Sequence, residues 1–261
     1  MSKSKKQLIG ICHVCGKEGP LSYEHIPPYS LGNNHASERY GVSDIVSKTK
    51  RFDVSDLSDF PYKELQQRGS GFQTICSDCN SYFGRNYVRE YVGCTRELGH
   101  MLIENRPKEE ESGIHLEGHN VNLLAFFKHV ISNFCTTTPA GTMSGCKEFL
   151  LNRESNAFPS HYKLFAFAVP SPSSNLLTTG WTTLFFKSSP ITACTVAVVA
   201  TFPIGFYLVD TAESSCILDN PGCDITSLSK CTWGDQPGFT VELPYMSLDK
   251  AWPTPIKSDV Q

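Results

Sequence analysis

Two pairs of cysteines near the start of the chain constrain its fold more than any other feature of the sequence. Each pair has the Cys-x-x-Cys spacing, and the pairs are Cys12 with Cys15 and Cys76 with Cys79. Two thiolates at this spacing reach the same side of a tetrahedral metal ion, and four complete the shell of a structural zinc. We therefore expect one zinc ion to join the two pairs. The alternative is four free thiols.

Size and composition indicate an ordinary globular protein. The chain has 261 residues, enough for one large domain or two small ones, and 40% of them are hydrophobic. No apolar run is long enough for a membrane span, and no apolar segment follows the basic N-terminus. The 11 cysteines are an odd number, and paired spacing in a reducing compartment is typical of metal binding. We expect a cytoplasmic protein with no membrane partner.

The net charge of −3 is unevenly distributed along the chain. Residues 1–100 carry 13 Lys and Arg against 11 Asp and Glu, whereas residues 101–261 carry 10 against 15. A protein that binds mainly through phosphate contacts has a stronger basic excess. Charge therefore permits nucleic-acid binding by the first part of the chain without arguing for it.

The segment between the cysteine pairs combines short strands with a long polar insertion. We predict strands over Gln7–Ile11 and Leu21–Ile26, the second ending in Glu24-His25-Ile26-Pro27-Pro28, where the prolines prevent further strand pairing. The insertion spans residues 29–70, with a short helix predicted near Tyr62–Gln67. An insertion of this length is usually functional or mobile. Its basic residues make it either a substrate-contacting arm or a solvated loop; these residues are Lys48, Lys50 and Arg51.

A strand over Phe72–Ile75 leads into the second cysteine pair, and a helix is predicted from Asn80 towards Glu104, with interruptions at Gly84 and Gly93. Three arginines of this helix fall at helical spacing and give it a basic face, either for substrate or for solvent with Glu90 and Glu97 as partners; they are Arg85, Arg89 and Arg96.

The remainder of the chain reads as a second, mixed domain. The charged, turn-rich stretch Pro107–Gly118 is the best boundary, and Val121–Thr136 has the apolar content of a core helix. Strand-like segments follow, separated by Pro, Gly and Ser; they are His161–Val169, Thr182–Phe186, Thr192–Thr201, Phe206–Val209 and Thr240–Leu243. We predict an α+β protein, with a zinc-stabilised domain over residues 1–106 and an α+β domain with an antiparallel sheet over residues 107–261.

Three polar residues lie close to the cysteine pairs in the sequence and suit hydrolytic chemistry. Glu24 and Asn80 are oxygen donors of the kind that a hard cation such as Mg²⁺ prefers. His25 lies beside Glu24 and could take a proton from a water molecule. Because one zinc would tie both cysteine pairs together, we expect the strand that ends at His25 and the helix that begins at Asn80 to lie side by side. Phosphodiester hydrolysis requires such a base and such a Lewis acid.

This order of motifs resembles the HNH endonuclease family, whose fold is the ββα-metal finger. The resemblance covers residues 12–92. Within the family, the chain is similar to a subgroup of bacterial proteins that share the motif Glu-His-Ile-Pro-Pro. It implies that His25 is the general base, that Glu24 and Asn80 hold a catalytic Mg²⁺ or Mn²⁺, and that the four cysteines hold a structural Zn²⁺. It further implies DNA as the substrate, with RNA as the alternative, and a role of the kind that nucleases have in bacterial antiviral defence.

One departure from the family pattern is Gly71, which stands where the family has its middle Asn. That Asn normally fixes the loop that carries the His, and Asn33, Asn34 and Ser70 are candidates to replace it. The departure also favours another reading, a zinc module that binds nucleic acid or a protein partner without cleaving. For residues 107–261 the sequence leaves open substrate recognition, homo-oligomer formation or another protein partner, and regulation.

Overall fold

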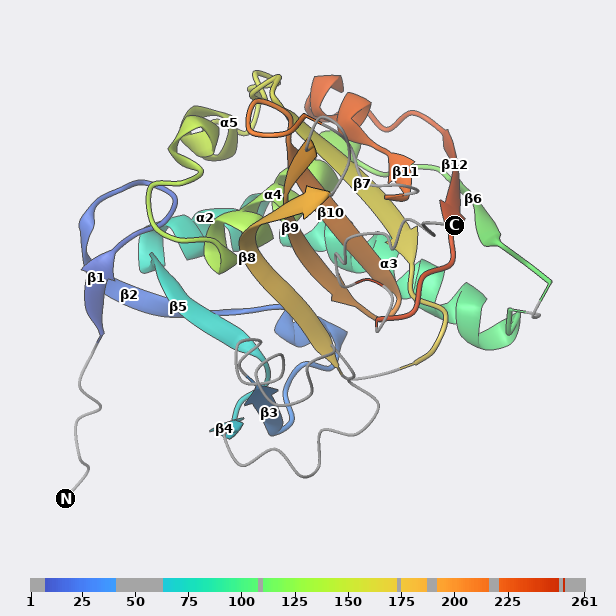
Figure 1. The fold of residues 1–261 in the computed structure, drawn as a ribbon, viewed down its shortest axis with the longest axis horizontal. Coiled ribbons are helices and arrows are strands. Elements are labelled where there is room, and N and C mark those ends of the chain that lie inside the picture. The colour runs from blue at the N-terminus through green and yellow to red at the C-terminus, as the bar shows by residue number, and fades with distance from the viewer. Residues whose placement is uncertain are drawn as a thin grey trace.

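The chain is an α+β protein in a computed structural model that describes residues 8–40, 63–107, 110–172, 175–186, 192–215, 221–248 and 251. The described part contains a three-stranded sheet in the order β1-β2-β5 and a five-stranded sheet in the order β11-β7-β10-β9-β8. Helices lie between and beside these sheets (Figure 1). The three-stranded sheet positions the candidate site, and the five-stranded sheet supports the main hydrophobic core.

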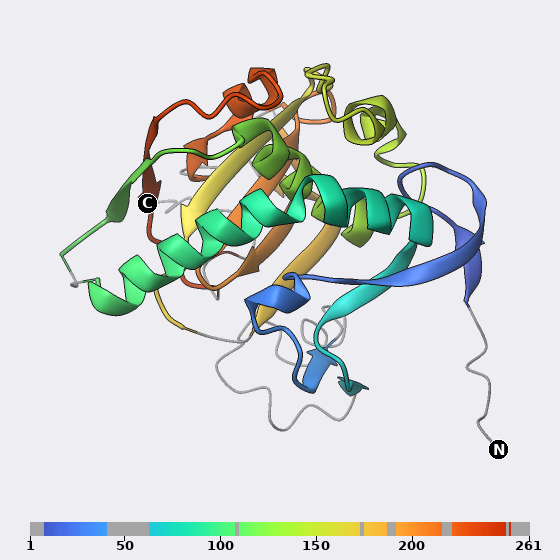
Figure 2. The same cartoon turned by 180° about the vertical axis from the view of Figure 1, so that it is seen from behind.

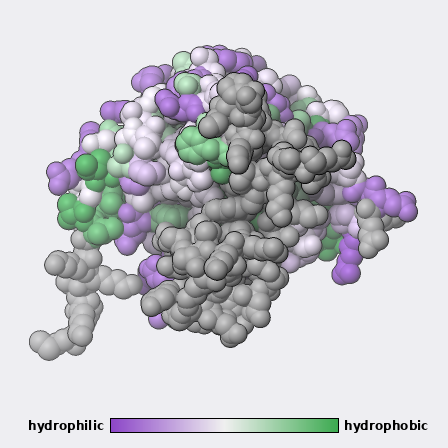
Figure 3. Space-filling model, viewed as in Figure 1, coloured by the Kyte–Doolittle hydropathy of each residue, from purple (hydrophilic) through white to green (hydrophobic). Residues whose placement is uncertain are grey.

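The three-stranded sheet is antiparallel and carries both cysteine pairs. Its strands are β1 (Ile9–Ile11), β2 (Glu18–His25) and β5 (Gly71–Cys76). The strands predicted near these positions are thereby confirmed. The apolar patch at the left of Figure 3 lies over β1, an edge strand on which Ile9 and Ile11 are more than half exposed.

The helix predicted after the second cysteine pair forms as two helices, α2 (Ser77–Asn86) and α3 (Val88–Glu104). The break lies at Tyr87, and Gly84 and Gly93 stay within the helices, so the predicted positions of the interruptions were wrong. Tyr87 is fully buried, its ring stacks on Phe83 at 5.7 Å, and its hydroxyl donates to the Leu150 carbonyl. Burial of this ring, rather than glycine flexibility, therefore accompanies the break.

The predicted core helix is confirmed as α4 (Leu123–Thr137). All its residues from Leu123 to Thr136 are buried, because α4 lies between α3 and the five-stranded sheet (Figure 2). Asn122 caps its first turn, where its side-chain oxygen accepts a hydrogen bond from the Ala125 amide at 3.0 Å. The short helix α5 (Lys147–Leu151) and the 3-10 turn η2 (Ser144–Cys146) follow it.

The predicted antiparallel sheet of the second part is also confirmed. Its strands are β7 (Tyr162–Ala168), β8 (Leu176–Phe186), β9 (Thr192–Thr201), β10 (Ile204–Asp210) and the two-residue β11 (Cys223–Asp224). In the pair β7–β10, Gly205 lies opposite Phe167, and a Cβ at Gly205 would come within 2.3 Å of that ring. The absence of a side chain at this position thus makes room for the aromatic ring.

Two further strand pairs form, and of their four strands only the one over Thr240–Leu243 was predicted. Residues Lys63–Gln66 form strand β4, which pairs with β3 (Ser37–Tyr40), so the short helix predicted near Tyr62–Gln67 was wrong. Residues Gly113–Gly118 form β6, which pairs with β12 (Phe239–Pro244), and the 3-10 turn η3 (Thr226–Lys230) precedes β12. Pairing with a partner distant in sequence decides the conformation of both segments.

A single buried cluster extends from the cysteine-bearing sheet to the five-stranded sheet. It includes Val14 and Ile75 beside the cysteines, Phe127 and Phe134 on α4, and Phe206 on β10. The division at residues 106 and 107 stays a prediction, and the packing between its two sides is continuous in the described part. Among the described residues, no helix has the length and apolar character needed to cross a membrane.

Candidate functional site

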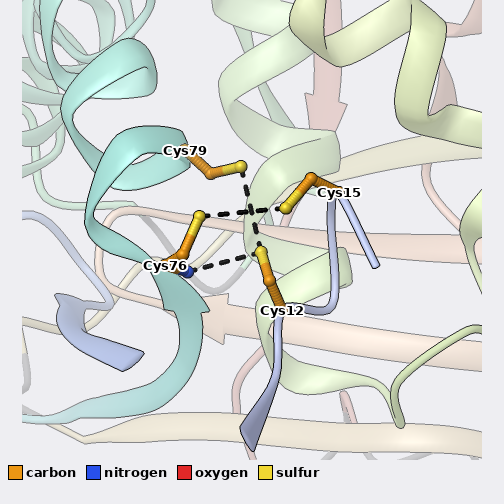
Figure 4. A group of neighbouring side chains, drawn as sticks. All are labelled: Cys12, Cys15, Cys76 and Cys79. Carbon is orange, nitrogen blue, oxygen red and sulfur yellow. Dashed lines mark hydrogen bonds between the residues drawn. The ribbon is translucent and has the colours of Figure 1, made fainter. Parts of the chain in front are cut away.

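The four cysteines of the two pairs converge on one point (Figure 4). All four sulfur atoms lie within 4.8 Å of one another, and the Sγ–Sγ distances are 3.8 Å for Cys12–Cys79 and 3.8 Å for Cys15–Cys76. A tetrahedral zinc with bonds of about 2.3 Å to sulfur separates its ligands by about 3.8 Å. The cluster therefore has the dimensions and ligand chemistry of a four-thiolate zinc site, as the sequence predicted.

Local backbone geometry brings each pair into position. The first pair lies in a tight turn in which the Gly16 amide donates to the Cys12 carbonyl at 2.9 Å, and Gly16 adopts a φ of +74°, which a side chain would disfavour. In the second pair, Cys76 ends β5 and Cys79 lies in the first turn of α2. The Cys76 amide donates to Cys12 Sγ at 3.3 Å, which links the two pairs directly.

The thiols perturb one another strongly. The contact between the Cys12 and Cys79 thiols lowers the pKa of Cys12 to about 4, and the same contact together with burial raises the pKa of Cys79. Burial also raises the pKa of Cys15. One thiolate is therefore stabilised by its neighbours, and a bound divalent cation would replace the remaining thiol protons.

The cysteine cluster is attached to the core through the last turn of α4. The His13 ring donates through Nδ1 to the Cys135 carbonyl at 3.2 Å, and the Thr74 hydroxyl donates to the Thr136 carbonyl at 2.9 Å. Carbonyl groups in the last turn of a helix have no partner within the helix, so these contacts satisfy them. These contacts thus fix β5 and the turn that carries the first cysteine pair with respect to α4.

Glu24 and Asn80, which the sequence predicts as ligands of a catalytic cation, lie against each other. Burial raises the pKa of the half-buried Glu24 carboxyl to about 7, and its contact with the Asn80 amide partly opposes this shift. The Asn80 amide nitrogen donates to Ser22 Oγ and to the Tyr23 carbonyl, both at 3.1 Å. These bonds orient the Asn80 side chain and leave its oxygen as the group suited to a cation.

His25, the predicted general base, is held at the end of β2 by a backbone carbonyl. Its Nε2 atom lies 2.9 Å from the Arg68 carbonyl, which can only accept, so Nε2 carries the proton and Nδ1 keeps the lone pair. The rings of Tyr23 and Tyr29 flank the imidazole edge-to-face, with centroids 4.9 and 5.5 Å away. The ring is therefore fixed in one tautomer, with Nδ1 as its basic atom.

The base and the carboxylate lie on different faces of β2. Ser22 and Glu24 both contact the Asn80 side chain, whereas the rings of Tyr23 and His25 contact each other. These contacts agree with alternation along a strand, although the register with β5 shifts between Ser22 and Glu24. Glu24 faces Asn80 of α2, whereas His25 faces the turn at Arg68. The imidazole and the carboxylate thus lie on opposite faces at the end of β2. Because Glu24 and His25 are neighbours in a strand, this arrangement follows from strand periodicity.

Asn33 links the two segments that surround His25. Its amide nitrogen donates to the carbonyls of Pro27 at 2.6 Å and Ser70 at 2.7 Å, and its oxygen accepts from the Ser70 amide at 2.7 Å. The sequence suggested Asn33, Asn34 and Ser70 as side chains that could fix the loop that carries His25. Of these three side chains, that of Asn33 makes the contacts described here. At Gly71 itself a Cβ would lie 2.2 Å from the Glu24 carbonyl oxygen, so a side chain does not fit there.

The predicted substrate-binding residues are spread over several elements. Arg85 lies exposed near the end of α2, and Arg89 lies on α3, where it lines a hollow of about 500 Å³ with Arg96, Glu90 and Glu97. Arg96 donates to the Ser30 carbonyl at 2.6 Å, in the 3-10 turn η1 (Tyr29–Leu31) close to His25. A further set lies outside the described residues: Lys48, Lys50 and Arg51.

Sequence reasoning missed several groups around His25. The Tyr23 and Tyr29 rings and the Arg68 carbonyl all hold the imidazole. Tyr23 could have been found from its spacing of two residues in a strand, whereas a backbone carbonyl carries no sequence signal. Comparison of the chain with models of protein families, with curated proteins and with solved structures gave no match.

Proposed function

We propose that the chain is a metal-dependent endonuclease that hydrolyses phosphodiester bonds of DNA, with His25 as the general base. The observation that carries the proposal is the arrangement of side chains at the end of β2. There the His25 imidazole, held in one tautomer, is next in sequence to Glu24, whose carboxylate contacts the Asn80 amide. The cysteine cluster holds β2, β5 and α2 together at this point. This combination supplies a base and a set of hard oxygen ligands in one region.

In the proposed mechanism, each residue has a separate task. Glu24 and the Asn80 oxygen would hold a divalent cation such as Mg²⁺ or Mn²⁺, which would stabilise negative charge on the phosphate and on the leaving oxygen. Because burial raises the pKa of Glu24 to about 7, this carboxyl would lose its proton in a fraction of the molecules when it holds the cation at neutral pH. His25 Nδ1 removes a proton from the attacking water, while Nε2–H stays bonded to the Arg68 carbonyl.

The proposal is tested with supercoiled plasmid and added Mg²⁺ or Mn²⁺. Loss of a general base typically lowers the rate by about 10²- to 10⁴-fold, so His25→Ala should cleave at a small fraction of the wild-type rate. His35→Ala is the matched control, because His35 is an exposed histidine near the start of the insertion. Zinc content and the circular dichroism spectrum should be unchanged in both variants. Equal cleavage by His25→Ala and the wild type would remove His25 as the base.

A second candidate is a zinc-held module that binds nucleic acid or a protein partner without cleaving. The observation that favours it is the separation of His25 and Glu24 on opposite faces of β2. The same assay discriminates the two when linear DNA, single strands and RNA are included. Binding without cleavage of any substrate with either metal supports the module, and cleavage of RNA alone replaces DNA as the substrate.

A further inference from the structure

Tyr29 is an exposed aromatic residue beside the proposed base. Its side chain is 60% exposed, and its ring lies edge-to-face with His25 at 5.5 Å with an interplanar angle of 80°. The 3-10 turn that carries it is well anchored, since the Leu31 amide donates to the Pro28 carbonyl at 2.9 Å and Arg96 donates to the Ser30 carbonyl at 2.6 Å. The turn thus presents a large ring surface to solvent in a fixed position.

Among the described residues, charge in the hollow that Ser30 lines is balanced rather than basic. This hollow has a volume of about 500 Å³, and its described charged residues are two arginines and two glutamates: Arg89, Arg96, Glu90 and Glu97. The whole chain has a net charge of −3. Proteins that bind duplex nucleic acid without contacting the bases depend on many contacts with phosphates and on the release of counterions. Affinity at this site therefore requires a contribution other than charge.

We infer that the substrate is unpaired nucleic acid, one base of which stacks on the Tyr29 ring beside His25 while a neighbouring nucleotide enters the hollow lined by Ser30 and Arg89. The inference rests on the proposed function and specifies its substrate class. Stacking on an aromatic side chain needs an open base face, which single strands offer and a continuous duplex buries between neighbouring bases. Stacking also tolerates any base, so it gives affinity without sequence preference.

The test measures binding of the full-length protein to a fluorescent 15-nucleotide single strand and to the same sequence as a blunt duplex. No Mg²⁺ or Mn²⁺ is added, so binding is measured apart from cleavage, and no chelator is used, so that the cysteine site is not stripped. A stacked base contributes about 1–3 kcal/mol, so Tyr29→Ala should weaken single-strand binding by roughly 5- to 140-fold. Duplex binding should be weaker than single-strand binding in the wild type and should change less than twofold in the variant.

Two controls separate the ring from its surroundings. Tyr29→Phe keeps the ring and should bind single strands within about threefold of the wild type, because stacking needs no hydroxyl. Phe185→Ala removes another aromatic side chain that is 68% exposed, on β8, and should leave binding unchanged. Equal affinity of the wild type for both probes, or equal single-strand binding by Tyr29→Ala, overturns the inference. Cleavage with added metal is scored separately, so binding without cleavage counts against the proposed nuclease and not against the stacking.

Discussion

Asn33→Ala removes the side chain that joins the loop after β2 to the turn before β5. Three hydrogen bonds are lost, with lengths of 2.6, 2.7 and 2.7 Å. Each such bond contributes about 0.5–1.5 kcal/mol net, and water can replace part of that at this half-buried position, so we expect a loss of about 1.5–3 kcal/mol in the free energy of unfolding. A domain stable by about 5–15 kcal/mol remains folded after this change.

The same substitution should affect the proposed chemistry more than the fold. Asn33 holds Ser70, and the carbonyl of Arg68, two residues earlier in the same turn, fixes the His25 ring. A displacement of about 1 Å at a catalytic group can cost about 10²-fold in rate, so kcat should fall by about 10- to 100-fold with little change in KM. Asn33→Asp should be worse than Asn33→Ala at neutral pH, because a carboxylate cannot donate to the two carbonyls it would face.

These effects are measured by urea unfolding in zinc-containing buffer and by steady-state cleavage of single-stranded DNA, the inferred substrate. Asn34→Ala is the matched control, since Asn34 is the exposed neighbour in the same turn, and it should match the wild type in both assays. A loss of stability below about 0.5 kcal/mol in Asn33→Ala, with unchanged kcat, would show that the three bonds do not hold the turn and would refute the reasoning.

Two other predictions concern the metal ligands. Cys76→Ser should reduce bound zinc well below one ion per chain and lower thermal stability. The control Cys94→Ser changes a thiol outside the cluster and should keep the zinc. Tight binding of one zinc by Cys76→Ser would contradict the four-thiolate site. For Glu24, a folded-state pKa of about 7 against an ordinary value of 4.5 means that the native state binds the proton more tightly. Without Mg²⁺, stability should therefore fall as pH rises from about 4.5 to about 7, by about 3 kcal/mol at 1.36 kcal/mol per pH unit. Glu24→Gln should remove this component, and identical pH profiles for both proteins would exclude Glu24 as its source.

The parts of the fold that follow from local patterns were predictable from the sequence. The core helix α4 follows from its dense apolar content, and the strands of the five-stranded sheet follow from apolar runs bounded by Pro, Gly and Ser. Elements whose conformation depends on a distant partner were not predictable. The strand β4 exists because β3 pairs with it, and the helix break at Tyr87 accompanies the burial of that ring against Phe83.

By itself, the sequence determined that two Cys-x-x-Cys pairs would meet, because the spacing of the thiols sets which atoms can share one metal ion. It also named Glu24 and His25 at the end of β2 and Asn80 on α2. Only the tertiary structure decided how they are arranged: His25 turns to the Arg68 carbonyl, Glu24 turns to Asn80, and Asn33 joins the flanking segments. The physical reason is that ligand spacing is a local property of the chain, whereas backbone carbonyls and close approaches such as Glu24 to Gly71 arise only when separate segments pack together.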